Sequence, residues 1–420
     1  MAFTPQWREK PWFPDIDVSI LPRGNGRSYG DSCLNDQGAL LDTTALDRFI
    51  NFNRDTGVLS CEAGVQLCDI LRLVEPHGWF LPVTPGTQFV TVAGAIANDV
   101  HGKNHHLRGC FSHHVLALQL ERSDGESLCC TPHENTEWFR ATVGGLGLTG
   151  FISRATLQLM HVDSPFVATE TFKTQNLSEF FERNEASQAF EYTVAWIDCL
   201  ARSAKRGRGH YIRGNHTNAP ANPPSRQRKR QPTIPLTPPI SAINPLSLRL
   251  FNSLYYHRQR ETLSHATQAR DPFFYPLDGI RHWNRLYGRR GFLQYQCVIP
   301  PAVAPEAIDE LLDKIARSRA GSFLVVLKAF GDIPSRGMLS FARPGVTLAM
   351  DFPYLGPKTL ALLDDLDTTT FAAGGALYPA KDARMSAEHF QQGYPEWATF
   401  ARYKDPAISS GFWRRVTGDS

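Results

Sequence analysis

The stretch ILPRGNGRSYGDSCLND, residues 20–36, places glycines at positions 24, 26 and 30 beside two arginines. A dinucleotide fingerprint of the Rossmann type needs the spacing G-x-G-x-x-G between a strand and a helix. Here three residues separate the last two glycines, and the turn-forming residues that follow predict no helix. Glycines flanked by serine and arginine can still gather backbone N–H groups into a nest for a pyrophosphate. We therefore predict a phosphate-binding loop outside a Rossmann fold.

A second stretch of small residues, PGTQFVTVAGAIANDVHG at 85–102, offers the same chemistry. Gly86 and Thr87 are expected to form a turn, after which small side chains leave the backbone accessible. The residues expected to expose their backbone are Ala93, Gly94, Ala95 and Ala97. Each stretch alone is also compatible with ordinary tight turns, but two such loops could together hold one long cofactor.

The composition of the chain is that of a globular protein. A length of 420 residues exceeds what one hydrophobic core usually supports, so we expect two domains. The apolar runs are too short for a membrane-spanning helix, and the first residues lack the apolar region of a signal peptide, so we place the protein in the cytoplasm. Eight cysteines without a CxxC pair predict buried free thiols rather than a disulfide framework.

The net charge is only +3, but the charges are unevenly distributed. Residues 199–260 contain twelve Lys or Arg and no Asp or Glu. Positive charge at this density favours an anionic partner, such as a phosphate, a lipid surface or a nucleic acid. Within this segment, residues 200–245 are so rich in proline, arginine and asparagine that we predict a mobile loop.

Hydrophobic patterns predict an α+β fold with many short strands. The first domain is expected at 1–160, the second at 161–375, and the segment 376–420 is expected to return to the first. In the second domain the order strand, helix, strand, strand, helix indicates an antiparallel sheet flanked by helices. The elements predicted are a helix at 66–78, a hairpin turning at Asp124–Gly125, a strand at 190–200, helices at 304–318 and near 357–370, and strands at 322–331 and 346–353.

Several long motifs resemble the vanillyl-alcohol-oxidase-type (PCMH-type) FAD oxidoreductases, and within them most closely the decaprenylphosphoryl-β-D-ribose 2-oxidase family. In the first domain these motifs are LPRGNGRSYGDSCLN, CEAGV, GWFLPVTPGTQFVTVAGAIANDVHGKNHH and FRATVGGLGLTGF. Further along, they are FFYPLDGIRHWNRLYGRRGFLQYQCVIP, SFLVVLKAFG and ALYPAKDARMS. The resemblance runs from residue 18 to about 415 and leaves out only the basic loop.

The resemblance implies that the first domain binds FAD. Some members of the wider superfamily bond the flavin covalently through a histidine in the glycine loop, where this chain has Tyr29, so we predict non-covalent FAD. The residues that the resemblance assigns to the cofactor are Arg23, Gly24, Asn25, Gly26, Arg27, Ser28, Tyr29, Pro85, Gly86, Thr87, Thr91, Gly94, Ala95, Ala97, His101, Gly102, Asn104, Gly147, Ile152, Tyr378 and Lys381.

Oxidation of a secondary alcohol needs hydride delivery to the flavin, removal of the hydroxyl proton and a cation for the charge of the reduced ring. The resemblance assigns the cation to Lys381, and it assigns proton movement and phosphate binding to His101 and Lys103. Without the resemblance, the sequence favours a solvated surface lysine paired with Asp382, and the motif match reverses that preference.

Histidines 101, 105, 106, 113 and 114 raise the alternative of a metal site. The segment that links the first three contains Gly102 and Asn104 and has no apolar period, so no helix is expected to order them. We therefore predict no metal, and structural roles for the last four histidines.

In the second domain the resemblance implies that Gln296 and Lys328 face the substrate from one side of a sheet, and that Trp196 and Phe274 form apolar walls. The resemblance further implies oxidation of a sugar hydroxyl, C2 of a polyprenyl-phosphate-linked pentose, whose keto product could pass to a partner reductase. The alternative within enzymes is an aldonolactone or alditol oxidase acting on a free sugar derivative.

The basic loop has three interpretations. It could be a lid at the entrance for a phosphorylated, lipid-linked sugar, a contact with an anionic membrane that keeps the protein peripheral to it, or an insertion without a partner. A nucleic-acid-binding protein is the alternative outside enzymes, but no aromatic interleaving or recognition motif accompanies RQRKRQP, so we predict no nucleic-acid partner.

Overall fold

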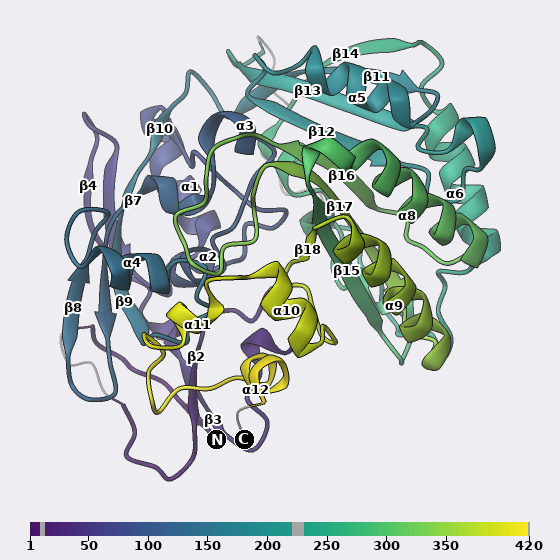
Figure 1. The fold of residues 1–420 in the computed structure, drawn as a ribbon. Coiled ribbons are helices and arrows are strands. Elements are labelled where there is room, and N and C mark those ends of the chain that lie inside the picture. Colours follow the sequence, from purple (N-terminus) through teal and green to yellow (C-terminus); the bar gives the residue numbers. More distant parts are fainter. Residues whose placement is uncertain (9–12, 221–230, 419–420) are drawn as a thin grey trace. The chain divides into compact units, whose positions relative to one another are not determined.

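The computed structural model describes residues 1–8, 13–220 and 231–418, and the chain divides into two compact units. The first unit contains Met1–Val162, Ile333–Arg343 and Pro379–Ser420, and the second contains Asp163–Asp332 and Pro344–Tyr378. Figure 1 shows both units, coloured along the sequence. The sequence patterns did not predict that Ile333–Arg343, which lies between two strands of the second unit, belongs to the first. The α+β fold class is confirmed.

The first unit is built on an antiparallel sheet of five strands in the order β4-β5-β9-β7-β8. A parallel sheet in the order β1-β3-β2 and the antiparallel pair β10-β6 complete it. Its strands are β1 (Ala2–Phe3), β2 (Ile20–Arg23), β3 (Ala39–Asp42), β4 (Phe49–Asn53), β5 (Val58–Glu62), β6 (Trp79–Phe80), β7 (Val115–Glu121), β8 (Ser127–Cys130), β9 (Phe151–Gln158) and β10 (Met160–His161). The predicted hairpin is confirmed: β7 and β8 pair across a turn in which Gly125 has a φ of +88°.

The helices of the first unit are short. They are α1 (Leu67–Val74), α2 (Val92–Ala97), α3 (His105–Arg108), α4 (Thr136–Thr142), α10 (Ala387–Gly393), α11 (Trp397–Phe400) and α12 (Gly411–Thr417). The prediction of α1 is confirmed, because apolar side chains at helical spacing are buried along it.

Two predictions about loops in this unit are wrong. Residues 92–97 form a helix rather than an open loop, because Thr91 caps its first turn by accepting a hydrogen bond from the Gly94 N–H at 3.2 Å. Residues 105–108 also form one helical turn, although their sequence has no apolar period. Small side chains hide a helix from periodicity, since periodicity detects only the contrast between apolar and polar faces.

The second unit is one antiparallel sheet of eight strands in the order β14-β11-β13-β12-β16-β17-β15-β18. The strands are β11 (Phe166–Thr174), β12 (Tyr192–Ile197), β13 (Gly209–Thr217), β14 (Leu263–Gln268), β15 (Phe292–Ile299), β16 (Val325–Phe330), β17 (Gly345–Pro353) and β18 (Ala376–Leu377). The helices are α5 (Leu177–Glu185), α6 (Pro245–His257), α7 (Arg270–Phe274), α8 (Ala304–Ser318) and α9 (Pro357–Ala372).

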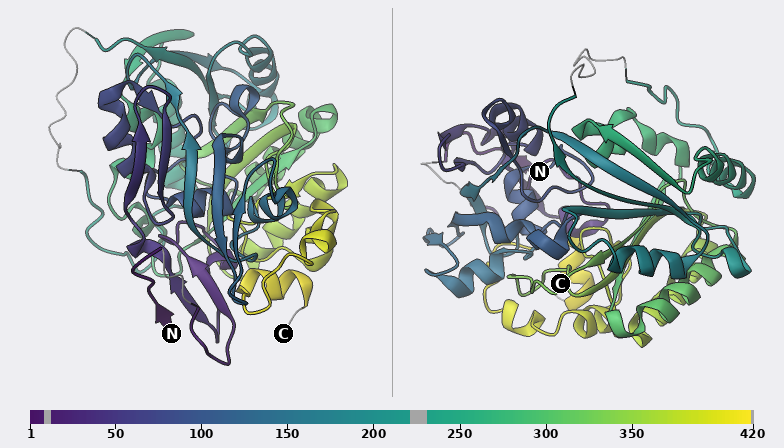
Figure 2. Two further views of the ribbon diagram at one scale, coloured as in Figure 1. Left: turned by 90° about the vertical axis from the view of Figure 1, so that its left-hand side faces the viewer. Right: turned by 90° about the horizontal axis from the view of Figure 1, so that it is seen from above.

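Helices α5, α8 and α9 pack side by side on one face of this sheet (Figure 2). Helix α8 buries an apolar stripe that includes Ile308, Leu311 and Ile315. The hydroxyl of Tyr295 in β15 lies 2.8 Å from the hydroxyl oxygen of Thr370 in α9, which shows that odd-numbered residues of β15 face the helices. The predicted helices at 304–318 and near 357–370 and the predicted antiparallel sheet are confirmed.

The prediction of a mobile loop at 200–245 is wrong for residues 209–217. Residues 209–217 form β13, which lies between β11 and β12 inside the sheet. Three arginines that made the segment look like a solvated loop are paired: Arg206 with Asp309 and Asp313, Arg208 with Asp198, and Arg213 with Glu170. Residues 221–230, which contain four of the twelve basic residues, lie outside the described residues.

All eight cysteines are free thiols; five are buried, and Cys129 is exposed. Among the helices that the structure describes, none combines the length and the apolar composition that crossing a membrane requires.

Candidate cofactor and active site

The glycine loop follows β2 directly and lies against the residues that precede α2. A Cβ atom on Gly24 would overlap the side-chain oxygen of Thr91, so glycine is required for this close approach. The side-chain amide of Asn25 donates a hydrogen bond to the backbone oxygen of Phe89 at 3.0 Å. The guanidinium carbon of Arg27 lies 5.7 Å from the centroid of the Phe89 ring. The two stretches of small residues are therefore neighbours in the first unit.

Arg23 supplies positive charge beside this loop. Gly26 has a φ of +56°, and a Cβ atom there would overlap the Arg23 guanidinium. The Nε atom of Arg23 is buried and has no hydrogen-bond partner within the described part of the chain. A buried donor of this kind next to a glycine-rich backbone suits an anion. The loop thus fits the pyrophosphate of a dinucleotide cofactor.

The C-terminal segment of the first unit meets the end of the glycine loop. The Tyr29 N–H donates to the Ala380 carbonyl at 2.9 Å, and a Cβ on Gly30 would overlap the carbonyl oxygen of Asp382. The Lys381 ammonium nitrogen lies 4.0 Å from the centroid of the Tyr29 ring, a cation–π contact. Two predicted site residues from opposite ends of the sequence are therefore in contact.

Asp382 anchors this junction. Its carboxylate is buried, accepts hydrogen bonds from the Met385 N–H at 3.0 Å and pairs with Arg415 at 2.8 Å. Arg415 also pairs with Asp31, which follows the glycine loop, at 2.8 Å. Lys381 is half-buried. This arrangement differs from the solvated Lys381–Asp382 surface pair that the sequence left as an alternative.

The segment from His101 to Asn104 follows α2. His101 is buried, and its backbone forms an isolated antiparallel β-bridge with Cys110. The centroid of its ring lies 5.9 Å from that of the Phe341 ring. Asn104 donates from its side-chain amide to the Pro82 carbonyl at 2.8 Å, which fixes the turn. Desolvation by burial lowers the pKa of Lys103 to about 7.

Asp99, two residues before His101, belongs to the candidate site and was missed by the sequence interpretation. It is 1% exposed and has a φ of +38°, an uncommon conformation for a residue with a side chain. Its carboxylate accepts from the Ser112 N–H at 3.0 Å and from the Ser340 hydroxyl at 2.6 Å. Burial raises the pKa of Asp99, and these two hydrogen bonds act against that rise. The sequence did contain a signal for this residue, because Asp99 is the single acid within a run of small and apolar residues.

Ser340 belongs to the segment Ile333–Arg343, so its hydrogen bond to Asp99 holds this segment close to His101, two residues further along the chain. Within the same segment, the Met338 N–H donates to the Arg140 carbonyl at 3.0 Å, and the His113 Nε2 atom lies 3.1 Å from the Pro334 carbonyl oxygen. These contacts place the Phe341 ring beside the His101 imidazole. Asp99 thus holds the segment that carries Phe341 against His101 in the candidate site.

The second glycine cluster packs on the end of α2. The Gly144 N–H donates to the Ile96 carbonyl at 3.0 Å, and the Leu146 N–H donates to the Ala97 carbonyl at 2.8 Å. A Cβ on Gly147 would lie 3.7 Å from the carbonyl oxygen of Pro22, just before the glycine loop. The predicted cofactor residue Gly147 therefore lies beside the others.

Other predicted cofactor residues have different surroundings. Ala95 is fully buried in α2, and Ile152 is buried in β9 opposite Leu120, so both side chains pack in the interior. Gly86 has open space where a Cβ would lie. The remaining members of the predicted set lie in the glycine loop, in the segment before α2, in α2 or in the turn after it: Ser28, Pro85, Thr87, Gly94, Ala97 and Gly102.

Two histidines of the cluster have backbone partners. The Cys110 N–H donates to Nδ1 of His113 at 3.0 Å, and Nε2 of His114 lies 3.0 Å from the Arg108 carbonyl oxygen. Burial lowers the pKa of His114 to about 4. Within the described ranges, no group of three or more His, Cys, Asp or Glu could hold a metal ion.

In the second unit, strand register places the predicted substrate residues on one face of the sheet. Residues that pair across neighbouring strands share a face. Gln296 in β15 pairs with Ala349 in β17, and Ala349 pairs with Val326 in β16. Val326 in turn pairs with Trp196 in β12. Lys328 lies opposite Thr347, and the Gln296 side-chain amide donates to the Thr347 hydroxyl at 3.3 Å. This face is the one opposite α8 and α9, because Tyr295 points toward α9.

The aromatic residues of this unit are held by their neighbours. The Trp196 indole donates to the Phe323 carbonyl at 2.9 Å, and its ring centroid lies 4.5 Å from that of Tyr255. Phe274 is buried at the end of α7, with its ring 4.9 Å from the Tyr192 ring. Tyr378 donates from its N–H to the Gln296 carbonyl at 2.9 Å, so it belongs to the second unit, whereas Lys381 belongs to the first.

The chain is similar in sequence to several known proteins. Residues 12–131 match the FAD binding domain family. Decaprenylphosphoryl-beta-D-ribose oxidase of Mycolicibacterium smegmatis is 36% identical over 412 residues, which cover 94% of this chain and 89% of that protein. An uncharacterized protein of Streptomyces coelicolor, in the mprA 5′ region, is 33% identical over 79% of this chain and 92% of its own. D-arabinono-1,4-lactone oxidase of Yarrowia lipolytica is 28% identical over only 34% of this chain.

Proposed function

The chain belongs to the decaprenylphosphoryl-β-D-ribose oxidase family, and we propose that it oxidises C2 of a polyprenyl-phosphate-linked pentose. It is an FAD-dependent oxidoreductase, because an FAD binding domain at 12–131 is combined with similarity to an oxidase over 94% of the chain. The sequence-based predictions of this family and this class of enzyme are confirmed. The substrate named for the relative is a ribose linked to decaprenyl phosphate.

The contact between Lys381 and Tyr29 carries the proposal, because it brings an ammonium group to the end of the glycine loop. Bound FAD would supply the acceptor for the hydride of the sugar, and the reduced ring would carry negative charge. Lys381 is suited to stabilise that charge and to orient the sugar hydroxyl. The ion pair between Asp382 and Arg415 holds the backbone next to Lys381, and the contact with the Tyr29 ring positions the ammonium itself before the reaction.

The cofactor would be held by the bare backbone from Gly24 to Gly26, by Arg23 and by the residues on either side of Thr91. We propose that FAD is bound non-covalently. Tyr29 supports this, because a phenol is not the group that covalent members place in the loop, and its ring is engaged by Lys381.

On the substrate side, we assign proton relay to His101 and phosphate binding to Lys103. A lysine with a pKa of about 7 is only partly charged near neutral pH, and binding of an anion would favour its charged form. Gln296 and Lys328 are proposed to bind the sugar through their shared sheet face, with Trp196 and Phe274 as apolar walls. The 2-keto product would then pass to a reductase.

The alternative of an aldonolactone or alditol oxidase has less support. The similarity to the lactone oxidase covers about a third of this chain, whereas the similarity to the polyprenyl-phosphate enzyme covers 94%. For nucleic-acid binding, three arginines of the basic segment are already paired with carboxylates. We retain membrane contact as the partner of this segment.

Lys381→Met tests the proposed role of the ammonium. Anaerobic mixing with a polyprenyl-phosphate pentose should bleach the flavin of the wild type, whereas the variant should keep its visible flavin spectrum and be reduced about 1000-fold more slowly. Lys358→Met, an exposed lysine in α9, is the matched control and should behave as wild type. Wild-type reduction rates in Lys381→Met would remove Lys381 from the mechanism, and a colourless wild type would refute the proposed function.

A further inference from the structure

Helix α6 presents leucines to solvent along one side. Leu246, Leu250 and Leu254 are 78%, 60% and 65% exposed. They are spaced by four residues, so they form one stripe along the helix. The segment before the helix adds Leu236 and Ile240, each 78% exposed. Apart from Met1, these five side chains are the most exposed large apolar residues in the described chain.

The opposite side of α6 is an ordinary buried face. Leu248, Asn252 and Tyr256, also spaced by four, are buried against the sheet. Leu248 packs with Ile243 and Tyr287 in a separate apolar cluster. The helix therefore has a complete interior stripe of its own, and the exposed leucines are not needed to attach it.

The segment before α6 is also fixed. The Ala242 N–H donates to the Leu286 carbonyl at 2.8 Å, and the Ile234 N–H donates to the Arg281 carbonyl at 3.0 Å. The Arg285 guanidinium donates to the Pro235 carbonyl at 2.7 Å. The apolar residues at 236 and 240 are thus presented from an ordered part of the second unit.

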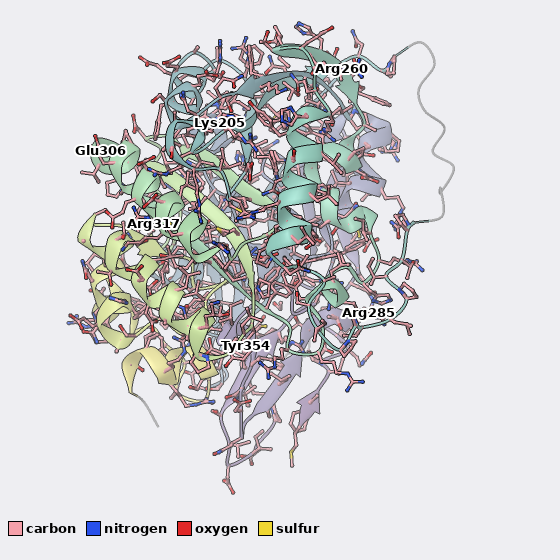
Figure 3. All side chains as sticks on the ribbon, turned by 90° about the vertical axis from the view of Figure 1, so that its right-hand side faces the viewer. Lys205, Arg260, Arg285, Glu306, Arg317 and Tyr354 are labelled. Carbon is pink, nitrogen blue, oxygen red and sulfur yellow. The ribbon has the colours of Figure 1, made fainter. Side chains whose placement is uncertain are left out.

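Positive charge borders the leucine stripe. Arg249 and Arg258 are exposed and, at about 100° per residue, lie on either side of the stripe around the helix. Arg260 is exposed just beyond the helix end, and α6 runs along the face seen in Figure 3 between the labelled Arg260 and Arg285. In the sequence, the nearest acids are Asp198, which pairs with Arg208, and Glu261. A partner for this face should therefore be both apolar and anionic.

From this pattern we propose that α6 is a membrane-docking helix: it lies in the plane of an anionic lipid surface, with Leu246, Leu250 and Leu254 among the acyl chains and the flanking arginines at the phosphates. At 13 residues α6 is about 20 Å long, which suits in-plane contact and is too short to cross a bilayer. The inference deepens the proposed function, because a polyprenyl-phosphate substrate resides at such a surface.

The test measures partition of the FAD-loaded enzyme onto sedimenting vesicles that contain about one third phosphatidylglycerol in phosphatidylcholine. The wild type should bind these vesicles and bind pure phosphatidylcholine less. The triple variant L246Q/L250Q/L254Q should lower the partition coefficient about tenfold or more. The matched control L116Q/L355Q changes two exposed leucines outside α6 and should bind as wild type.

A second variant, R249Q/R260Q, separates charge from apolar contact. It should lose about tenfold in binding to the anionic vesicles and little in binding to phosphatidylcholine. Equal binding by the wild type and the leucine variant would overturn the proposal. So would a wild-type dimer, seen by light scattering, that the leucine variant converts to monomer while vesicle binding is unchanged, because the occupant would then be a second copy.

The outcome can be separated from that of the proposed function. Reduction of the flavin by a water-soluble, short-chain isoprenyl-phosphate pentose does not require a membrane, so L246Q/L250Q/L254Q should be reduced at the wild-type rate. Reduction without vesicle binding would refute docking and leave the proposed function standing. Vesicle binding that depends on the leucines, without flavin reduction in the wild type or any variant, would refute the proposed function and leave docking standing.

Discussion

The glycine loop of the first unit and the sheet face of the second unit position their groups in different ways. In the loop, Gly24, Gly26 and Gly30 each approach a side chain or a backbone carbonyl so closely that no Cβ fits, so close contact along the bare backbone of the loop determines the geometry. On the sheet face, Gln296 and Lys328 are placed by strand register, and their side chains project from a scaffold that is complete without them.

This difference determines what a substitution should affect. A Cβ added in the loop must displace the group that it meets, which is a side chain at Gly24 and Gly26 and backbone at Gly30, and interiors at native packing density resist such movement. A substitution on the sheet face changes one side chain and leaves the ladder of hydrogen bonds intact. We therefore expect loop variants to lose stability and FAD together, and sheet-face variants to lose substrate affinity alone.

The largest effect is expected for Gly30→Ala, because its Cβ would overlap the Asp382 carbonyl oxygen at the junction that holds Lys381. We expect a loss of about 3 kcal/mol or more in the free energy of unfolding, measured on the apoprotein by denaturant titration. Gly86→Ala, in the second small-residue stretch, has open space for its Cβ and should stay within about 0.5 kcal/mol of wild type. Similar stabilities for the two variants would contradict the backbone argument.

An intermediate effect is expected from the titration of Lys103. Its pKa of about 7 means that the ammonium predominates below that pH and the neutral amine above it. A sugar phosphodiester keeps one negative charge throughout this range, so its KM should rise by about tenfold per pH unit above 7. Lys103→Met should have a higher KM and a flat profile. A profile that persists in Lys103→Met would assign the titration to another group, with His101 the first to examine.

The smallest effect is expected for Gln296→Leu. Loss of one hydrogen-bonding group on the sheet face should raise KM for the pentose substrate about tenfold, while FAD content and unfolding temperature stay at wild-type values. Thr347→Val removes the partner hydroxyl at 3.3 Å but keeps the amide, and should change KM less. Loss of bound FAD in Gln296→Leu would contradict the expectation that sheet-face variants lose substrate affinity alone.

Local patterns predicted those parts of the fold in which neighbouring residues decide the structure. Helix α8 follows from an apolar period, and the β7–β8 hairpin follows from Asp124–Gly125. Helix α2 was missed because its small side chains have no amphipathic contrast. Strand β13 was missed because the arginines around it find their carboxylates on other elements, such as Asp313 and Glu170, which composition cannot reveal.

By itself, the sequence determined that two bare stretches in the first third of the chain could hold a phosphate-bearing cofactor, since glycine spacing is a local property. Family motifs added the candidates Lys381, His101 and Lys103. Only the tertiary structure decided that Lys381 rests on Tyr29, that Asp99 ties Ser340 beside His101, and that α6 turns its leucines outward. These are contacts and exposures between segments distant in sequence, and they depend on how the whole chain packs rather than on any local pattern.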